Sequence, residues 1–455
     1  MNGSIRIEVD AIDFQIACRR FNVRATITRE RQMPVVDEFV LRLLAVTERL
    51  SISRMRSWFG FSESEMETVL VDLGRRSLVE LEGDDVLLSA TARDLFRNIV
   101  PGGVPQLVEV APLLADVWFD LVSRNMVPPS RGRETAHLVK LREQPEAREI
   151  PDSFAREAFE LNFRDYARRI RRFPDADAVN LYSVSDVEGG RYGFQTLRAG
   201  VAFEPATFSI RPTFSDLADT PANFGKLTIA ANEAWQVLGG SDGGPSTGSD
   251  YERMTGDTRL AALLREPSSG DAWAIALGAV DVPGFRQTVG AIYLEKNAEI
   301  LVEAVAKSTI TNAKTDINWL RPNGSSWGRA LQMADLMGFL RNAVHGAGAN
   351  ISTTTLSMPR STHRSIRTDH KRLFDRGVLL PQSHLASNLE ILLVPKVAAF
   401  VNVHLPVRGH SVPIGGIVTE PKRLARIEDR LRSGADERWE ELWKSEARRS
   451  HRQAN

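Results

Sequence analysis

Apolar residues in the segment PVVDEFVLRLLAVTERL recur at the spacing of one helical face. Val36, Phe39, Val40 and Leu43 carry this period, which predicts an amphipathic helix with a buried apolar side. A short second helix, SISRMRSWFG, is expected to end at Gly60, because glycine readily takes the left-handed conformation that closes many helices. The pattern therefore predicts two consecutive helices in this part of the chain.

A third helix is predicted to begin at Ser62, since Glu65 three residues later completes a capping box. The next segment, SLVELEGDDVLLSA, contains two short apolar strands around a Gly-Asp-Asp turn, which is typical of a β-hairpin. Three helices followed by a hairpin give the element order of a winged helix, a module that contacts DNA or another protein. We predict this module over residues 34–100.

Residues 1–33 alternate between apolar and polar side chains, which predicts an N-terminal β arm or hairpin. Residues 108–122, VEVAPLLADVWFDLV, are interpreted as an apolar helix. Another helix is expected over residues 154–172, followed by three strand-like runs between Ala178 and Ile210. Residues 101–238 are therefore predicted to form a helical connector and an antiparallel sheet region.

Residues 239–250, GGSDGGPSTGSD, form a Gly/Ser-rich stretch without the apolar side chains that order a chain, so a loop or domain boundary is expected. Residues 251–455 are expected to form a C-terminal α/β domain. The runs AWAIALGAV, EILLVPKVAAFVNVHLP and VPIGGIVTE are interpreted as strands. Helices are expected at AEILVEAVAKS, SWGRALQMADLMGFLRNAVHGAG, EPKRLARIEDRLRSG and the Trp-rich DERWEELW. The predicted fold class is a multidomain α+β protein.

The amino-acid composition excludes several classes of protein. The 58 basic and 58 acidic residues leave no net charge to attract DNA or an acidic membrane, so any nucleic-acid contact must come from local patches. The single cysteine, Cys18, rules out an internal disulfide framework and a cysteine-based zinc site. No apolar run approaches the ~20 residues of a membrane span, and no secretory signal is visible. We therefore expect a cytoplasmic protein that does not enter a membrane.

The predicted winged helix offers few residues for DNA contact. Such a module places its third helix in the major groove, yet this helix begins with Glu63 and Glu67, and the hairpin tip over residues 80–85 is acidic. Docking of a partner protein is therefore the alternative use of the module. The phosphate contacts predicted from the second and third helices are Arg54, Arg56, Arg75 and Arg76.

A second group of arginines lies in the helix expected over residues 154–172. Five guanidinium groups within nine residues can neutralise several phosphates and give salt-dependent binding. The alternative is a solvated helix end, where cations complement the helix dipole and pair with glutamates one turn earlier. Helical spacing puts Arg164, Arg168 and Arg171 on one stripe, with Arg169 and Arg172 beside it.

The C-terminal third resembles a known family. The segment HKRLFDRGV, from His370 to Val378, precedes a β run from Leu389 to Val403, and then come GIVTEPKRLARIEDRL and DERWEELW. This order, over about residues 325–445, resembles the phospholipase D-like half-domain of some bacterial winged-helix regulators. In the catalytic members, a His-x-Lys-x4-Asp motif occurs twice, one histidine acts as nucleophile and the other as general acid, and the lysines hold phosphoryl oxygens.

That catalytic motif is missing here. After His384 the lysine and aspartate positions hold Ala386 and Ile391, and after His363 the lysine position holds Ser365. The resemblance therefore implies a degenerate module that binds a ligand or partner. The alternative is a phosphodiesterase or nuclease of this class whose non-standard histidine cluster consists of His363, His370 and His384.

The sequence thus predicts a non-enzymatic protein associated with nucleic acid. It would act either as a DNA-binding transcription regulator or as a subunit of a bacterial DNA-processing or phage-defence complex. No phosphate-binding loop, dinucleotide-binding glycine motif, metalloprotease motif or serine-hydrolase motif occurs, so no cofactor and no metal is expected. The expected partners are DNA and either another protein or further copies of the chain.

Overall fold

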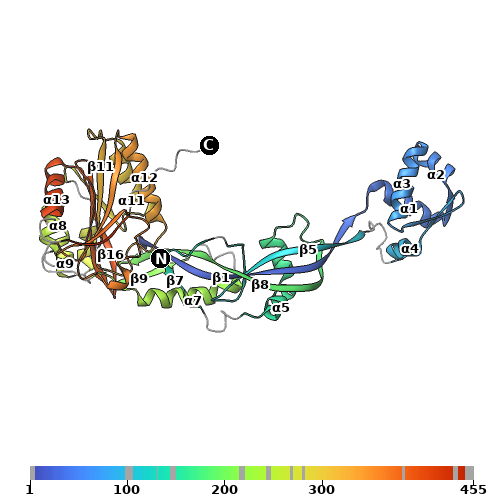
Figure 1. Ribbon diagram of the computed structural model, residues 1–455, viewed down its shortest axis with the longest axis horizontal. Coiled ribbons are helices and arrows are strands. Elements are labelled where there is room, and N and C mark those ends of the chain that lie inside the picture. Colours follow the sequence, from blue (N-terminus) through green and yellow to red (C-terminus); the bar gives the residue numbers. More distant parts are fainter. Residues whose placement is uncertain are drawn as a thin grey trace.

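The computed structural model describes residues 6–97, 106–130, 132–143, 150–214, 221–241, 247–266, 270–278, 282–381, 385–433 and 439–445. These residues form a mixed α+β protein with three sheets, which confirms the predicted fold class at that level. Figure 1 shows a large sheet domain at one end, a small helical unit at the other, and a long arm of strands between them.

The arm is built around one strand, β1 (Ile7–Gln32), which is 26 residues long. This strand pairs antiparallel with β5 (Gln106–Asp120) on one side and with β8 (Val179–Glu204) on the other. The apolar alternation near the N-terminus therefore forms one continuous strand and not a hairpin. The sheet is completed by the short strands β6 (Met126–Val127), β7 (Val139–Lys140) and β9 (Ser209–Thr213).

The prediction of a helix over residues 108–122 is wrong, because most of this segment belongs to strand β5. Alternate residues from Leu113 to Phe119 are buried, whereas Leu114 between them is 75% exposed. A run this apolar is compatible with a helix or a strand by composition alone. The segment is a strand because it forms antiparallel pairs with β1 along the whole of β5.

The outer edge of β5 is open along most of its length. The partner on that side is β6, which pairs only with Trp118 and Phe119. Among the described residues, no strand lies beside the outer edge from Gln106 to Val117. Pro112 is in the middle of this stretch, where proline is tolerated because no neighbouring strand needs its N–H.

Short helical segments cover one face of the arm sheet. They are α5 (Asp152–Leu161), α6 (Phe163–Asp165) and the π-helix η2 (Tyr166–Ile170). The single regular helix expected over residues 154–172 is therefore interrupted. The break is at Asn162, whose φ is −112° and whose side-chain amide donates to the Ala158 carbonyl at 2.8 Å. Because the π-helix changes the residue spacing, the arginines after it do not continue a regular helical stripe.

The distal unit, residues 33–97, has a core of its own around Val40, Leu44, Met66 and Leu73. Gly60 has a φ of +69° at the end of α2, and the predicted capping box at Ser62 and Glu65 is present. The strands form a three-stranded sheet in the order β2-β4-β3. The elements are α1 (Val35–Thr47), β2 (Arg49–Ser51), α2 (Ile52–Phe59), α3 (Glu63–Arg75), β3 (Val79–Glu82), β4 (Asp85–Leu88) and α4 (Ala90–Arg97).

The apolar side predicted for α1 is only partly correct. Val40, Leu41 and Leu44 are buried in the core of the distal unit. Phe39, predicted to be buried with them, is 55% exposed. The helix therefore has two apolar faces, and a sequence window cannot tell which of them meets the core.

The C-terminal domain is an eight-stranded mixed sheet in the order β10-β16-β15-β14-β11-β12-β13-β17. Strands β11, β12 and β13 are parallel to one another, whereas the remaining pairs are antiparallel. The strands are β10 (Phe285–Val289), β11 (Lys314–Leu320), β12 (Asn350–Met358), β13 (Arg376–Leu379), β14 (Leu389–Val394), β15 (Ala398–Val407), β16 (His410–Val418) and β17 (Glu440–Lys444).

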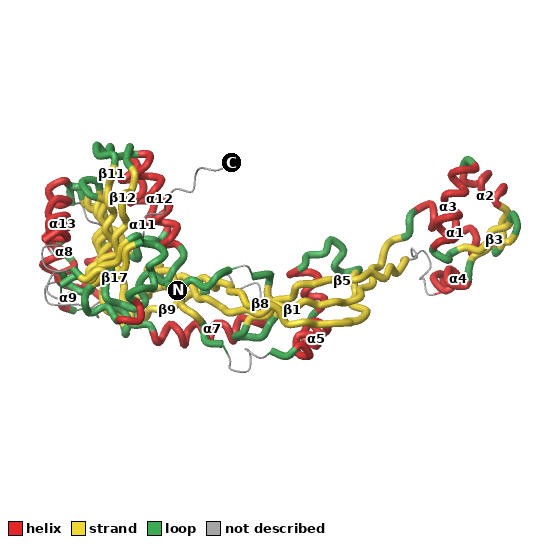
Figure 2. The backbone as a smooth tube through the Cα atoms, viewed as in Figure 1, coloured by secondary structure: helices red, strands yellow, loops and turns green. Residues whose placement is uncertain are grey.

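Helices cover both faces of this sheet. One face packs against α11 (Glu295–Ala306) and α12 (Gln332–Gly346), and the other against α8 (Thr247–Thr255), α9 (Leu260–Arg265) and α13 (Pro421–Ser433). Figure 2 shows α7 (Pro221–Val237) where the arm meets this domain. Among the described residues, no helix is both long and apolar enough to cross a membrane.

Two predicted elements of the C-terminal domain have the opposite secondary structure. AWAIALGAV, expected to be a strand, contributes to helix α10 (Gly270–Leu277), whose Trp273 is buried. DERWEELW, expected to be a helix, contributes to strand β17. There the Trp443 ring covers Gly377 of β13 so closely that a Cβ at this position would collide with the ring. Packing across the sheet overrides the local pattern in this second case.

The loop predicted over residues 239–250 is partly ordered. Thr247 to Asp250 form the first turn of α8. At the other end, the Gly240 N–H donates to the Gly409 carbonyl at 2.8 Å. The partners lie far away in the sequence, so a count of apolar side chains within the segment could not reveal this order. Residues 242–246 lie outside the described part of the chain.

Replacing Phe119 with alanine should lower the free energy of unfolding of the arm by about 3–5 kcal/mol. The side chain is fully buried and packs against Phe21 and Phe154. Leu114→Ala on the same strand is the matched control and should cost less than about 0.5 kcal/mol, because Leu114 faces solvent. Urea denaturation followed by circular dichroism measures both changes. Equal losses in the two variants would contradict the strand assignment of β5.

Candidate functional site

The four arginines predicted to contact phosphate on the distal unit have different surroundings. Arg76 pairs with Asp37 at 3.1 Å and also with Asp72, and Arg56 lies 3.7 Å from Glu63. Arg54 and Arg75 are exposed and form no ion pair with another described residue. Two of the four positive charges are therefore offset within the unit itself.

The distal unit as a whole is acidic. Its residues 33–97 include twelve Asp and Glu residues, eight arginines and no lysine, a net charge of −4. On α3, Glu63, Glu65 and Glu67 are exposed. Hydrogen bonds from the Ser62 backbone N–H and hydroxyl lower the pKa of Glu65, so this carboxylate stays ionised at neutral pH. The start of α3 would therefore repel a phosphate backbone.

The arginines of the arm are less strongly neutralised. Arg168 is paired with Asp177 at 2.5 Å. The others are exposed and form no ion pair with a described residue. These residues lie near the far end of the arm, where the Glu30 N–H of β1 donates to the Ala178 carbonyl at 2.8 Å. The exposed arginines are Arg164, Arg169, Arg171 and Arg172.

The predicted histidine cluster does not form one solvent-facing group. His363 is exposed, and its Nδ1 lies 2.7 Å from the Ser365 hydroxyl. His370 is 1% exposed, and its Nε2 donates to the Gly328 carbonyl at 3.0 Å. Burial lowers the pKa of His370 well below its usual value, so the ring is neutral at pH 7. His384 lies outside the described residues.

A buried polar cluster surrounds Glu390 in the middle of the C-terminal sheet. This carboxylate accepts hydrogen bonds from Trp319 Nε1 at 3.0 Å and Trp327 Nε1 at 2.6 Å, and its other oxygen lies 2.8 Å from His404 Nε2. Arg321 stacks over Trp327 at 4.8 Å, and burial lowers its pKa to about 9. Glu390 is fully buried, and both of its carboxyl oxygens have hydrogen-bond partners, as is usual for polar groups in a protein interior.

This cluster continues into the joint between the C-terminal domain and the arm. Asp10 of β1 accepts a hydrogen bond from the Tyr293 hydroxyl at 2.6 Å, and Asp13 accepts one from the Leu331 N–H at 2.6 Å. Arg329 donates to the His137 carbonyl at 3.2 Å and pairs with Asp369 at 2.8 Å. No local sequence pattern marks this joint, because its members come from widely separated segments.

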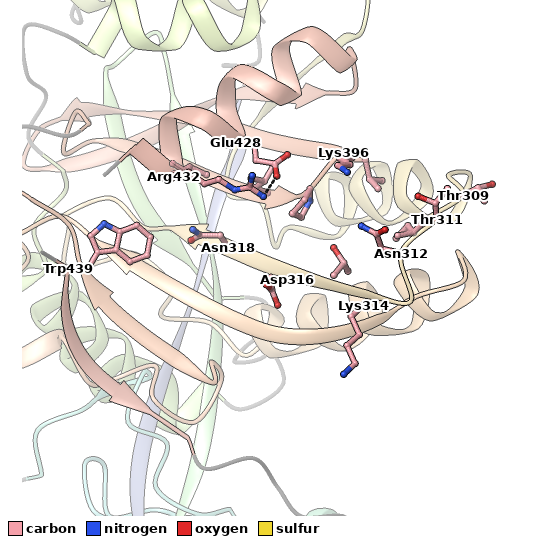
Figure 3. Close-up of a pocket in the computed structure, with 16 residues that line it drawn as sticks. Thr309, Thr311, Asn312, Lys314, Asp316, Asn318, Lys396, Glu428, Arg432 and Trp439 are labelled. Atoms are coloured by element: carbon pink, nitrogen blue, oxygen red, sulfur yellow. Dashed lines mark ion pairs between the residues drawn. The ribbon is translucent and has the colours of Figure 1, made fainter. Parts of the chain in front are cut away.

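A polar hollow of about 360 Å³ lies beside the amino end of β11 (Figure 3). Its walls carry Asp316 and Asn318 from β11, Lys396 from the turn after β14, and the ion pair between Glu428 and Arg432 of α13. Positive and negative side chains alternate around it, so its charge selects no class of ligand. Among the described residues, no group of three His, Cys, Asp or Glu side chains could hold a metal ion.

No protein-family model matches the chain, and no curated protein matches it. Among solved structures, the chain is similar to TrmBL2, described as an archaeal chromatin protein with a novel mode of DNA binding. The identity is 13% and the TM-score 0.22, and the match covers 50% of this chain and 71% of that chain. A similarity this low does not establish a shared fold or a shared function.

Two groups of the joint should give opposite dependences of stability on pH. Burial lowers the pKa of His137 to about 4, so below pH 6.5 the unfolded chain binds a proton that the folded chain does not, and stability falls on acidification. Burial raises the pKa of Asp10 from 3.8 to about 7. The folded carboxyl then holds a proton that the unfolded chain releases, and stability falls as the pH rises through this range.

His137→Asn and Asp10→Asn should separate these contributions, each worth about 2 kcal/mol between pH 5 and pH 7. Relative to the parent chain, His137→Asn should become less stable on going from pH 5 to pH 7, and Asp10→Asn should become more stable. Urea midpoints at the two pH values measure the difference. Parallel pH dependences in all three proteins would show that neither group is buried as described.

Proposed function

We propose that the distal unit is a winged helix and that it docks another protein. Three helices precede the β3–β4 hairpin, and β4 lies between β2 and β3, which is the arrangement expected of this module. The net charge of −4 and the acidic start of α3 favour a basic protein surface over DNA as its partner.

We propose further that the chain is a non-enzymatic adaptor that contacts nucleic acid through the arm. The observation that carries this proposal is the group of exposed arginines at the far end of the arm. In a chain with 58 basic and 58 acidic residues, such a local surplus is what can attract phosphate. A subunit of a bacterial DNA-processing or phage-defence complex fits this division of roles. A transcription regulator would need the winged helix itself to contact DNA.

For the C-terminal domain we propose a phospholipase D-like module that has lost its catalytic chemistry. Three observations support this: β11 to β13 are parallel, a late strand, β16, precedes α13, and the His-x-Lys-x4-Asp motif is missing. Of the two described members of the alternative histidine cluster, His370 is buried and neutral, and its ring donates to a backbone carbonyl. These properties suit a structural anchor better than a nucleophile.

Reversing two arm arginines, Arg164→Glu and Arg171→Glu, should weaken binding of labelled duplex DNA at least about tenfold at 0.1 M salt and reduce the slope of log Kd against log salt by about 2. Both side chains are exposed, so the fold should be unaffected. Fluorescence anisotropy across a salt series gives the slope. Denaturing electrophoresis of the same samples shows whether the strand is intact.

The matched control carries the same change of charge on the distal unit, Arg54→Glu and Arg75→Glu, and should bind DNA within about twofold of the parent chain. Loss of binding in this control, with the arm variant unaffected, would replace the adaptor by a DNA-reading winged helix. Cleavage of the labelled strand would contradict the adaptor proposal and support the nuclease hypothesis.

A further inference from the structure

The β12–β13 loop, residues 359–375, concentrates positive charge on the C-terminal domain. Between residues 360 and 372 it carries four arginines and one lysine against a single aspartate. That aspartate, Asp369, lies 2.8 Å from Arg329 Nη1, so its charge is offset by a cation outside the loop. Four of the five cations are exposed: Arg360, Arg364, Lys371 and Arg372. Arg360 lies 3.6 Å from Glu440 of β17, whereas the other three form no ion pair with a described residue.

The loop is held in a fixed shape against the core of the domain. Thr362, Ile366, His370 and Phe374 are buried and recur every four residues. Successive turns between them are closed by backbone hydrogen bonds, and Arg367 donates to the carbonyls of residues 360 and 362. The exposed cations lie between the buried positions and therefore on the solvent side of these turns. A preformed arrangement of this kind loses little entropy when a ligand binds.

The position of the loop is also that of a binding surface. It follows the carboxyl end of β12, which is parallel to β11 and β13. In open α/β sheets, ligands bind outside the carboxyl ends of the parallel strands. On its other side the loop touches the arm, where Arg372 Nη1 lies 3.4 Å from the Glu134 carbonyl oxygen.

We propose that the β12–β13 loop is a second nucleic-acid-binding surface, which contacts the phosphate backbone of duplex DNA. All its exposed residues between 360 and 372 can donate hydrogen bonds, and such side chains make most contacts to phosphate oxygens. These residues are Arg360, Ser361, His363, Arg364, Ser365, Thr368, Lys371 and Arg372.

The same residues argue against two other partners. Single-stranded nucleic acid binds through aromatic side chains on which its bases stack, and none of the exposed loop residues other than His363 is aromatic. A protein partner would need large apolar anchors or Tyr or Trp side chains at the centre of the interface, and the exposed positions of the loop between 360 and 372 hold none of these. Duplex DNA bound without sequence specificity fits the loop best.

The test is duplex binding by the full chain with Arg364→Glu and Lys371→Glu, measured by fluorescence anisotropy from 50 to 300 mM NaCl. Neither residue forms an ion pair with another described residue, and neither is used to hold the loop. We expect Kd to rise at least about tenfold at 100 mM NaCl and the salt slope to fall by about 2. The variant Arg364→Gln and Lys371→Gln should show a smaller change in the same direction.

The control places the same change of charge elsewhere in the domain, with Lys307→Glu next to the end of α11 and Arg341→Glu on α12. Both side chains are exposed, so this variant should bind within about twofold of the parent chain. Circular dichroism melting curves should coincide for the parent and all variants. If a glutamate variant is unfolded, the glutamine variant decides the question.

The outcomes separate this inference from the arm contact proposed above. Wild-type affinity in the folded loop variants, with binding lost in the arm variant, overturns the loop surface and leaves the adaptor intact. Loss in the loop variants alone supports the loop and refutes the arm contact. Binding of single strands but not duplex, or of an acidic protein but no DNA, overturns the loop proposal, and no binding by the parent chain overturns both.

Discussion

The pairing of β1 with a strand on each side is the constraint on which the rest of the molecule depends. Its register with β8 begins at Ile7 and its register with β5 continues to Gln32, so one strand runs from the C-terminal domain to the start of the distal unit. Only a central strand of a sheet forms backbone hydrogen bonds to a neighbouring strand on each of its two sides. One continuous strand therefore connects the two ends of the molecule, and the apolar core of the arm is built on it.

At the C-terminal domain the same strand is fixed by buried polar contacts. Asp10 and Asp13 belong to β1, yet their hydrogen-bond partners, Tyr293 and Leu331, lie around 300 residues further along the chain. Hydrogen bonds in a buried site are directional and costly to leave unmade, so they fix orientation more strictly than apolar packing does. The orientation of the arm on the sheet domain thus rests on these buried polar contacts together with the apolar core that Val9, Ile12 and Phe14 of β1 share with the C-terminal sheet.

Local signals in the sequence predicted local structure well. The capping box at Ser62 and the left-handed Gly60 depend on neighbouring residues only, and both are present. Predictions that needed distant partners were wrong: residues 108–122 are apolar enough for a helix, but β1 makes them a strand.

In the candidate sites too, features set by neighbouring residues could be predicted from the sequence, whereas features set by distant partners could not. The cations of the arm and of the β12–β13 loop could be read directly from the sequence as clusters. How much of a cluster's charge is offset could not be read in this way, either there or on the distal unit, since it depends on ion pairs between separated residues. Arg76 is paired with Asp37, which lies 39 residues earlier, and Asp369 is paired with Arg329 from another loop. The buried role of His370 likewise depends on the Gly328 carbonyl, 42 residues away.

The open edge of β5 has a consequence for the behaviour of the protein at high concentration. A long strand edge is a template on which another chain can add a strand, and this is a common route to aggregation. Pro112 in the middle of this edge has no N–H to donate, and it interrupts the row of donors that an added strand would need. The proline thus acts as a gatekeeper, which keeps a necessarily long sheet from growing beyond its own chain.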